Sequence, residues 1–98
     1  MTGCRLTPAA RRDLSSIWDY TEDNWGSQQA ELYLNEIRAA FERIAKRPDR
    51  GRVCDEIRAG YRRYATGSHL VFYVVSNNDG RVDVIRILHQ RMDPTRRM

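Results

Sequence analysis

The spacing of apolar side chains divides the chain into two amphipathic helices followed by a set of strands. Residues 10–25 and 30–44 repeat apolar or small side chains at steps of three and four, the spacing of one helix face. The first face consists of Ala10, Leu14, Ile17, Thr21 and Trp25, and the second of Ala30, Tyr33, Leu34, Ile37, Ala40, Phe41 and Ile44. Each segment is therefore predicted to be a helix that buries one stripe.

The ends of both helices carry recognisable start and stop residues. Thr7 is predicted to cap the first helix, and Pro8 to occupy its first turn, where the missing N–H costs nothing. Gly26 is expected to end this helix, Ser27 to cap the next one and Pro48 to stop it. Because the link is so short, the two helices are expected to fold back as an antiparallel hairpin.

Strand-like segments fill the second half of the chain. Residues 61–65, 69–75 and 82–88 are predicted strands, joined by a tight turn at 66–68 and a loop at 76–80. Residues 82–88 are almost continuously apolar, which predicts a strand buried on both faces. Strands joined by such short turns form an antiparallel meander.

Two further segments complete the predicted fold. Residues 3–6 are a candidate strand that should join the sheet, and the connector at 48–60 should contact the core through Val53 and Ile57. The sequence thus predicts a single domain, residues 1–98, of the α+β class with the order β-α-α-β-β-β. A helical hairpin would pack on one face of a small, twisted, mainly antiparallel sheet.

The composition favours a globular protein without a metal or cofactor. Apolar residues make up 41% of the chain and charged residues 31%, which is typical of a folded domain. No apolar run suits a membrane span or a signal peptide, so a cytoplasmic protein is expected. Cys4 and Cys54 are too few for a disulfide framework and lie in no metal-ligand spacing, so both are expected to be reduced.

Positive charge is concentrated in the second half of the chain. Residues 1–49 hold seven Lys or Arg and eight Asp or Glu, whereas residues 50–98 hold ten Arg and five Asp or Glu. The net charge of +4 is therefore the sum of −1 and +5. Such a basic half suits nucleic acid, an acidic protein partner or simply a solvated face.

Several aromatic side chains lie around the predicted hairpin. Trp18 and Tyr20 fall outside the apolar stripe and are interpreted as a partner surface, because aromatic anchors dominate interfaces. Trp25 and Tyr33 are interpreted as core residues instead.

The end of the last predicted strand carries the candidate chemistry. A ribonuclease-like site would use His89 as acid or base, with Arg86 and Arg91 on a phosphate and Arg62 nearby. By alternation His89 and Arg91 share a face, whereas Arg86 and Arg91 do not. The alternative is a structural histidine beside surface arginines. His69 is interpreted as a hydrogen-bonding residue of the core or sheet edge.

The chain resembles the ParE toxins of the RelE/ParE superfamily, the toxin half of type II toxin–antitoxin modules, also called plasmid stabilisation proteins. The matching pieces are LTPAARRDLSSIWDY at 6–20, WGSQQA at 25–30, YLNEIR at 33–38, IAKRPDRGR at 44–52, EIRAGYRR at 56–63, SHLVFY at 68–73 and RILHQRMD at 86–93. The resemblance spans almost the whole chain and implies the same β-α-α-β-β-β fold.

The resemblance also implies a function. ParE toxins poison DNA gyrase without being enzymes and are neutralised by a co-encoded ParD-like antitoxin, which alone contacts operator DNA. The other branch of the superfamily cuts mRNA on the ribosome with lysines, arginines and a C-terminal tyrosine or histidine. Here Lys46 is the only lysine and no tyrosine follows Tyr73, so the ParE branch is favoured. The alternatives are an mRNA endonuclease built on His89, Arg91, Arg86 and Arg62, or a non-toxic co-repressor partner of the antitoxin.

Two surfaces are expected for the two partners. The candidate gyrase-facing residues are Arg62, Arg63, His89 and Arg91, and the candidate antitoxin-binding residues are Trp18, Tyr20, Arg58 and Arg63. An acidic antitoxin segment would complement the basic half, adding a helix to a groove or a strand to the sheet edge.

Overall fold

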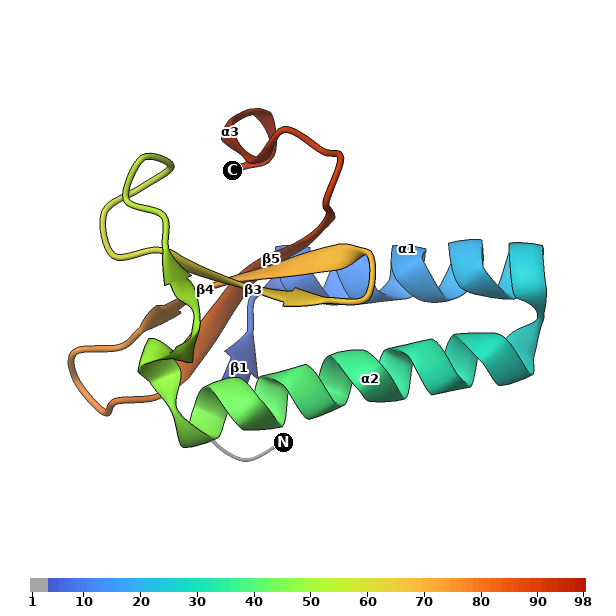
Figure 1. Ribbon diagram of the computed structural model, residues 1–98, viewed down its shortest axis with the longest axis horizontal. Coiled ribbons are helices and arrows are strands. Elements are labelled where there is room, and N and C mark those ends of the chain that lie inside the picture. The colour runs from blue at the N-terminus through green and yellow to red at the C-terminus, as the bar shows by residue number, and fades with distance from the viewer. Residues whose placement is uncertain (1–3) are drawn as a thin grey trace.

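The computed structural model describes residues 4–98 and consists of a helical hairpin packed along a five-stranded sheet (Figure 1). Its elements are β1 (Cys4–Leu6), α1 (Pro8–Trp25), α2 (Ser27–Lys46), the 3-10 turn η1 (Pro48–Arg50), β2 (Arg52–Val53), β3 (Arg62–Thr66), β4 (His69–Val75), β5 (Val82–His89) and α3 (Pro94–Arg97). The α+β class and the predicted element order are confirmed, and β2 and α3 are additional short elements. Gly3, the predicted start of the first strand, lies outside the described residues.

The sheet has the order β1-β5-β4-β3-β2. β1 joins it parallel to β5, whereas the other neighbours pair antiparallel. β5 therefore lies inside the sheet, between β1 and β4. Its side chains enter apolar clusters on both faces of the sheet, which explains its almost continuous apolar sequence. The edge strand β2 has only two residues, too few to produce a detectable alternation in the sequence.

The main core lies between the hairpin and the sheet. It contains the buried side chains of Ala10, Ile17, Leu34, Ile37, Phe41, Ile44, Val71, Tyr73, Val82, Val84 and Ile87. The largest of these is Tyr73, which is fully buried but keeps its hydroxyl satisfied. This hydroxyl donates to the carbonyl of Pro48 and accepts from the amide of Gly51, both at 2.8 Å. Tyr73 thereby fixes η1 against the sheet.

A second apolar cluster covers the other face of the sheet. Phe72 and Leu88 are its strand residues, and Cys54, Tyr61 and the partly buried Met98 pack on them. Because Phe72 stands between Val71 and Tyr73, which point toward the hairpin, β4 is buried on both faces. The connector that follows β2 and the C-terminal segment thus act as a thin second layer.

A β-bulge lies in β5. Phe72 pairs with Arg86 while the next residue, Tyr73, pairs with Val84, so Ile85 has no direct partner. The extra residue shifts the alternation of side chains by one position. As a result, Val84 and Ile87 both face the hairpin although they are three positions apart.

Several sequence predictions about the connections can now be judged. Thr7 caps α1, with its hydroxyl accepting from the amide of Ala10 at 3.1 Å, as predicted. The prediction that Ser27 caps α2 is wrong, because a single residue, Gly26, separates the helices and occupies the cap at φ 90°. Only glycine adopts this backbone conformation readily.

Of the two residues of the connector 48–60 that were expected to contact the core, one does and the other does not. Ile57 packs against the second cluster, as predicted. Val53 does not reach the core: it is 50% exposed, because β2 is an edge strand with no layer covering its side chains. None of the helices in residues 4–98 is long and apolar enough to cross a membrane.

Candidate functional site

Two histidines meet at one end of the sheet. The register of β4 and β5 pairs His69 with His89, and their rings make an edge contact with centroids 5.4 Å apart. Tyr33 of α2 reaches His69 from the hairpin, with its hydroxyl 2.6 Å from Nδ1, and accepts the amide of Ser68 at 3.0 Å. His69 is therefore a hydrogen-bonded, partly buried residue, as predicted.

The environment of His69 favours its neutral form. Burial is the main cause that lowers the pKa of His69 from 6.5 to about 4, and the nearby His89 lowers it further. At neutral pH the His69 ring therefore carries no charge. His89 is held differently, since its Nδ1 accepts the amide of Arg91 at 3.1 Å within the turn that follows β5.

A pocket of about 300 Å³ opens beside this pair of histidines. In this region the hairpin extends past the end of the sheet (Figure 1). The pocket is lined by Tyr20, Thr21, Trp25, Gln29, Tyr33, Ser68, His69 and His89. We call it the histidine pocket. Tyr20 and Trp25 stand at its α1 side, each 63% exposed, with ring centroids 6.0 Å apart in an edge-to-face contact.

The prediction that Trp25 belongs to the core is wrong. Trp25 does continue the apolar stripe of α1, but the sheet ends before the helix does (Figure 1), so the Trp25 ring remains largely exposed. Tyr33, in contrast, packs against the main core, as predicted. Trp18, expected on a partner surface, is also partly buried against that core, whereas Tyr20 is exposed.

Arg86 is bound within the fold through all three nitrogens of its guanidinium. Its Nε and Nη2 donate to the two oxygens of Asp13 at 2.8 and 2.9 Å, and its Nη1 donates to the carbonyl of Arg97. Asp13 also accepts the backbone amide of Ile87 at 2.8 Å, at the part of β5 that β1 does not reach. Arg86 thus connects α1, β5 and the C-terminal segment.

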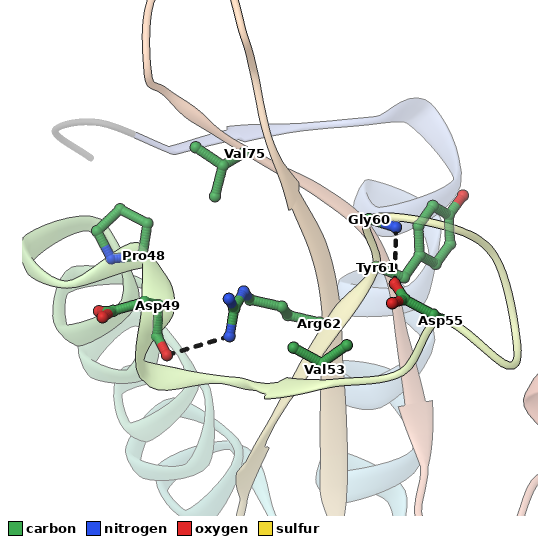
Figure 2. A pocket seen from close by; sticks show the side chains of 8 residues that line it. All are labelled: Pro48, Asp49, Val53, Asp55, Gly60, Tyr61, Arg62 and Val75. Atoms are coloured by element: carbon green, nitrogen blue, oxygen red, sulfur yellow. Dashed lines mark hydrogen bonds between the residues drawn. The ribbon is translucent and has the colours of Figure 1, made fainter.

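Arg62 lies at the opposite end of the sheet from the histidines. It pairs with Tyr73, which is four residues along β4 from His69, a separation of roughly 13 Å. Its Nη1 donates to the carbonyls of Gly51 at 2.8 Å and Asp49 at 3.2 Å. Figure 2 shows this guanidinium inside a second, more open pocket of about 650 Å³, between the turn at Asp49 and Val75.

The remaining candidate residues lie elsewhere. Arg63 opposes Phe72 and Arg52 and so shares the face of the second cluster, opposite to Arg62. Arg58 and Arg91 are exposed, the first in the connector and the second in the turn after β5. Of the four residues of the ribonuclease-like set, the structure brings together only His89 and Arg91, through a backbone contact.

Two features of this region were missed in the sequence. The Asp13–Arg86 pair joins residues 73 positions apart, and the Tyr33–His69 pair joins residues 36 apart. No sequence pattern near these residues indicates either contact, because both contacts depend on how the hairpin lies on the sheet. The one available clue was a charged residue, Arg86, inside an apolar strand, which requires a partner. Within residues 4–98 no three His, Cys, Asp or Glu side chains are arranged to hold a metal ion.

Comparisons with known proteins agree with the sequence resemblance. The family model described as the ParE toxin of the type II toxin-antitoxin system, parDE, matches residues 4–94. Toxin ParE1 of Mycobacterium tuberculosis is 53% identical over 93 residues, covering 95% of this chain and 94% of that protein. Toxin ParE1 of Caulobacter vibrioides is 48% identical over 89 residues, covering 91% and 90%.

One solved structure supports the fold. A chain from a structure described as the chromosomal ParDE TA system from P. aeruginosa aligns with a TM-score of 0.76 at 18% identity, covering 91% of this chain and 96% of that one. At this identity the match concerns the fold alone. The family match and the two relatives identify the family, and the chain belongs to the ParE toxin family of type II toxin–antitoxin systems.

Proposed function

We propose that this toxin acts by binding and poisoning DNA gyrase, without catalysing a reaction, and that a ParD-like antitoxin neutralises it. Membership of the ParE family supports the toxin role. The observation that favours binding over catalysis is the engagement of Arg86 by Asp13 and the Arg97 carbonyl. An arginine whose donors are occupied in this way is poorly suited to clamp a scissile phosphate.

The gyrase-facing residues belong to this proposal. We assign them to Arg62, Arg63, His89 and Arg91. Arg91 is exposed and the other three are partly buried. They lie in separate regions of the sheet, so the contact would have to be a broad one. The proposal also implies a cytoplasmic location, because gyrase acts on the chromosome.

The antitoxin contact is proposed at the hairpin and the basic face. Tyr20 and the unexpectedly exposed Trp25 offer aromatic anchors, and the partly buried Trp18 lies on the same helix. Arg58 and Arg63 would attract an acidic segment. The edge strand β2 could accept an added strand, and operator DNA would be reached only through the antitoxin.

A supercoiling assay tests the gyrase proposal directly. Antitoxin-free protein is incubated with purified gyrase, ATP and relaxed plasmid, and the DNA is then treated with detergent and protease. We expect reduced supercoiling together with accumulated linear DNA. The variants Arg63→Ala and His89→Ala should weaken both effects, whereas Arg11→Ala, an exposed change on α1, should not. Full supercoiling at saturating protein, with no linear product, would refute the proposal.

A second candidate is the ribosome-dependent mRNA endonuclease. The position of His89 on a pocket, next to Arg91, is the observation that favours it. It predicts cleaved transcripts soon after induction, and loss of toxicity in a folded His89→Ala variant. Intact transcripts during growth arrest would exclude it. The third candidate, a co-repressor without toxicity, is refuted by growth arrest on induction in the absence of antitoxin.

A further inference from the structure

We propose that the histidine pocket binds the carboxylate of an acidic residue in the antitoxin, while an apolar neighbour of that residue rests on Tyr20 and Trp25. This inference rests on the toxin–antitoxin function proposed above. The inference specifies which chemical group of the antitoxin is bound and which pocket of the toxin binds it.

The first part of the argument is the proton on His89. The backbone amide of Arg91 donates to Nδ1 of His89 at 3.1 Å. An imidazole nitrogen that accepts an amide hydrogen carries no proton itself. Neutral His89 therefore has its proton on Nε2, which makes Nε2 a hydrogen-bond donor.

The same reasoning applies to His69 on the neighbouring strand. The oxygen of Tyr33 already accepts the amide of Ser68 at 3.0 Å, and within residues 4–98 the acceptor that lies opposite its O–H is Nδ1 of His69 at 2.6 Å. We therefore assign Tyr33 as the donor and Nδ1 of His69 as the acceptor. The proton of neutral His69, like that of His89, lies on Nε2.

The lining of the pocket suits a ligand that accepts hydrogen bonds. Both histidines line it, and none of its eight lining residues is an Asp or Glu. The hydroxyl of Thr21 is already used, since it donates to the carbonyl of Ile17 at 2.7 Å. A group that only accepts hydrogen bonds and carries negative charge fits such a site, in a chain whose net charge is +4.

The rim of the pocket indicates that the acceptor belongs to a protein segment. Tyr20 and Trp25 are each 63% exposed and contact each other, so they offer a continuous aromatic surface, which we call the aromatic shelf. Exposed aromatic pairs of this kind are typical anchors for the side chains of a partner protein. An acidic residue beside an apolar one would use the two histidines and the aromatic shelf at once.

Occupation of this pocket has a direct consequence for toxicity. His89 is one of the proposed gyrase-facing residues. An antitoxin carboxylate bound to it would cover that residue, so capture and neutralisation would be the same event.

A small-molecule probe tests the pocket without any partner. The full chain, labelled with nitrogen-15, is titrated with phenylacetate while the histidine ring nitrogens are followed by NMR. We expect the Nε2 resonances of His69 and His89 to shift with phenylacetate, but much less with phenylacetamide, its neutral isostere. Equal shifts with both would mean a purely apolar pocket, and shifts with inorganic phosphate alone would favour a nucleic-acid ligand; either result overturns the proposal, as does no shift at all.

The affinity for the antitoxin encoded beside the toxin gene tests the partner. His89→Phe, which keeps a ring but loses the donor, should weaken binding about tenfold. His89→Gln, which keeps an N–H donor, should stay within about threefold of wild type, and both variants should remain folded, although His89→Phe loses the hydrogen bond from the Arg91 amide. Unchanged affinity for His89→Phe would overturn the inference. If wild-type toxin does not bind the antitoxin at all, the proposed function fails, while the phenylacetate result still decides the pocket.

Discussion

The carboxylate of Asp13 holds the guanidinium of Arg86 at two points, with N–O distances of 2.8 and 2.9 Å, and the same carboxylate caps the amide of Ile87. The side chains of Asp13 and Arg86 are only 13% and 23% exposed. One acidic side chain of α1 therefore satisfies an arginine and a free backbone donor of β5. This explains why a strand that is mostly apolar tolerates an arginine.

Replacement of Asp13 should destabilise the fold rather than only alter its surface. Asp13→Ala leaves a buried amide and a mostly buried guanidinium without their partner, so we expect a loss of about 3 kcal/mol in the free energy of unfolding. Asp13→Asn, which keeps one acceptor, should lose about half as much. Urea unfolding measures both. The control Asp19→Ala, an exposed change on the same helix, should stay within about 0.5 kcal/mol of wild type; equal effects of both alanine variants would contradict the role of Asp13.

Gly67 should be the least replaceable turn residue of the meander. Its φ is 56°, and a Cβ atom there would lie 2.5 Å from Cε1 and 2.7 Å from the hydroxyl of Tyr33. Gly67→Ala therefore combines backbone strain with a displaced Tyr33, and we expect a loss of about 3 kcal/mol. Gly80→Ala is the matched control, because its φ is 70° but nothing lies within 4 Å of the added atom. It should lose only about 1 kcal/mol in the same denaturation experiment.

The buried and the exposed aromatic residues of α1 should have different roles, the first in stability and the second in binding. Trp18→Ala removes packing from the main core and should lower the free energy of unfolding by about 2 kcal/mol. The double variant Tyr20→Ala/Trp25→Ala removes two exposed rings, so its stability should change by less than about 1 kcal/mol. Its affinity for the antitoxin should instead fall by about 2 kcal/mol or more, as measured by calorimetry. Wild-type affinity of the double variant would show that the exposed rings contact no antitoxin.

His69 should make the protein less stable in mild acid. Its pKa is about 4 in the folded chain and 6.5 ordinarily, mainly because of burial, then because of His89, with Asp13 acting in the opposite direction. Between these two values the unfolded chain binds a proton that the folded chain does not, so stability falls as the pH falls. After allowance for partial exposure, the loss between pH 7 and pH 4 is on the order of 2 kcal/mol.

Denaturation midpoints across this pH range measure the effect. His69→Gln retains a polar side chain but does not titrate, so its stability should decline less steeply than that of the wild type. The acidic groups of both proteins are the same, and the difference between the two curves therefore isolates His69. Parallel curves would mean that His69 already titrates normally in the folded chain.

Most of the fold was predictable because its elements are long and locally patterned. The stripe from Ala30 to Ile44 and the capping by Thr7 each depend on residues close in sequence, and both predictions are confirmed. The errors occur where the burial of a residue depends on how far the neighbouring layer of the fold reaches. Trp25 has the spacing of the apolar stripe of α1, but it is exposed because the sheet ends before the tip of the helical hairpin.

The candidate site was predictable as a list of residue types but not as an arrangement. Simple alternation cannot locate the bulge at Ile85, which decides the face of every later residue in β5. The partners of Arg86 and His69 are likewise set by how the hairpin lies across the sheet. Arg86 therefore resembled a functional arginine in the sequence, although in the structure it joins three elements.

The parallel pairing of β1 with β5 has a consequence for the order in which the chain can fold. The hydroxyl of Thr7, directly after β1, donates to the carbonyl of Ile85, 78 positions along the chain. During synthesis the first strand has no partner until the last strand has been made, and contacts of such long range slow folding. The five-stranded sheet of a newly made chain can therefore be complete only after residues 82–89 have been synthesised.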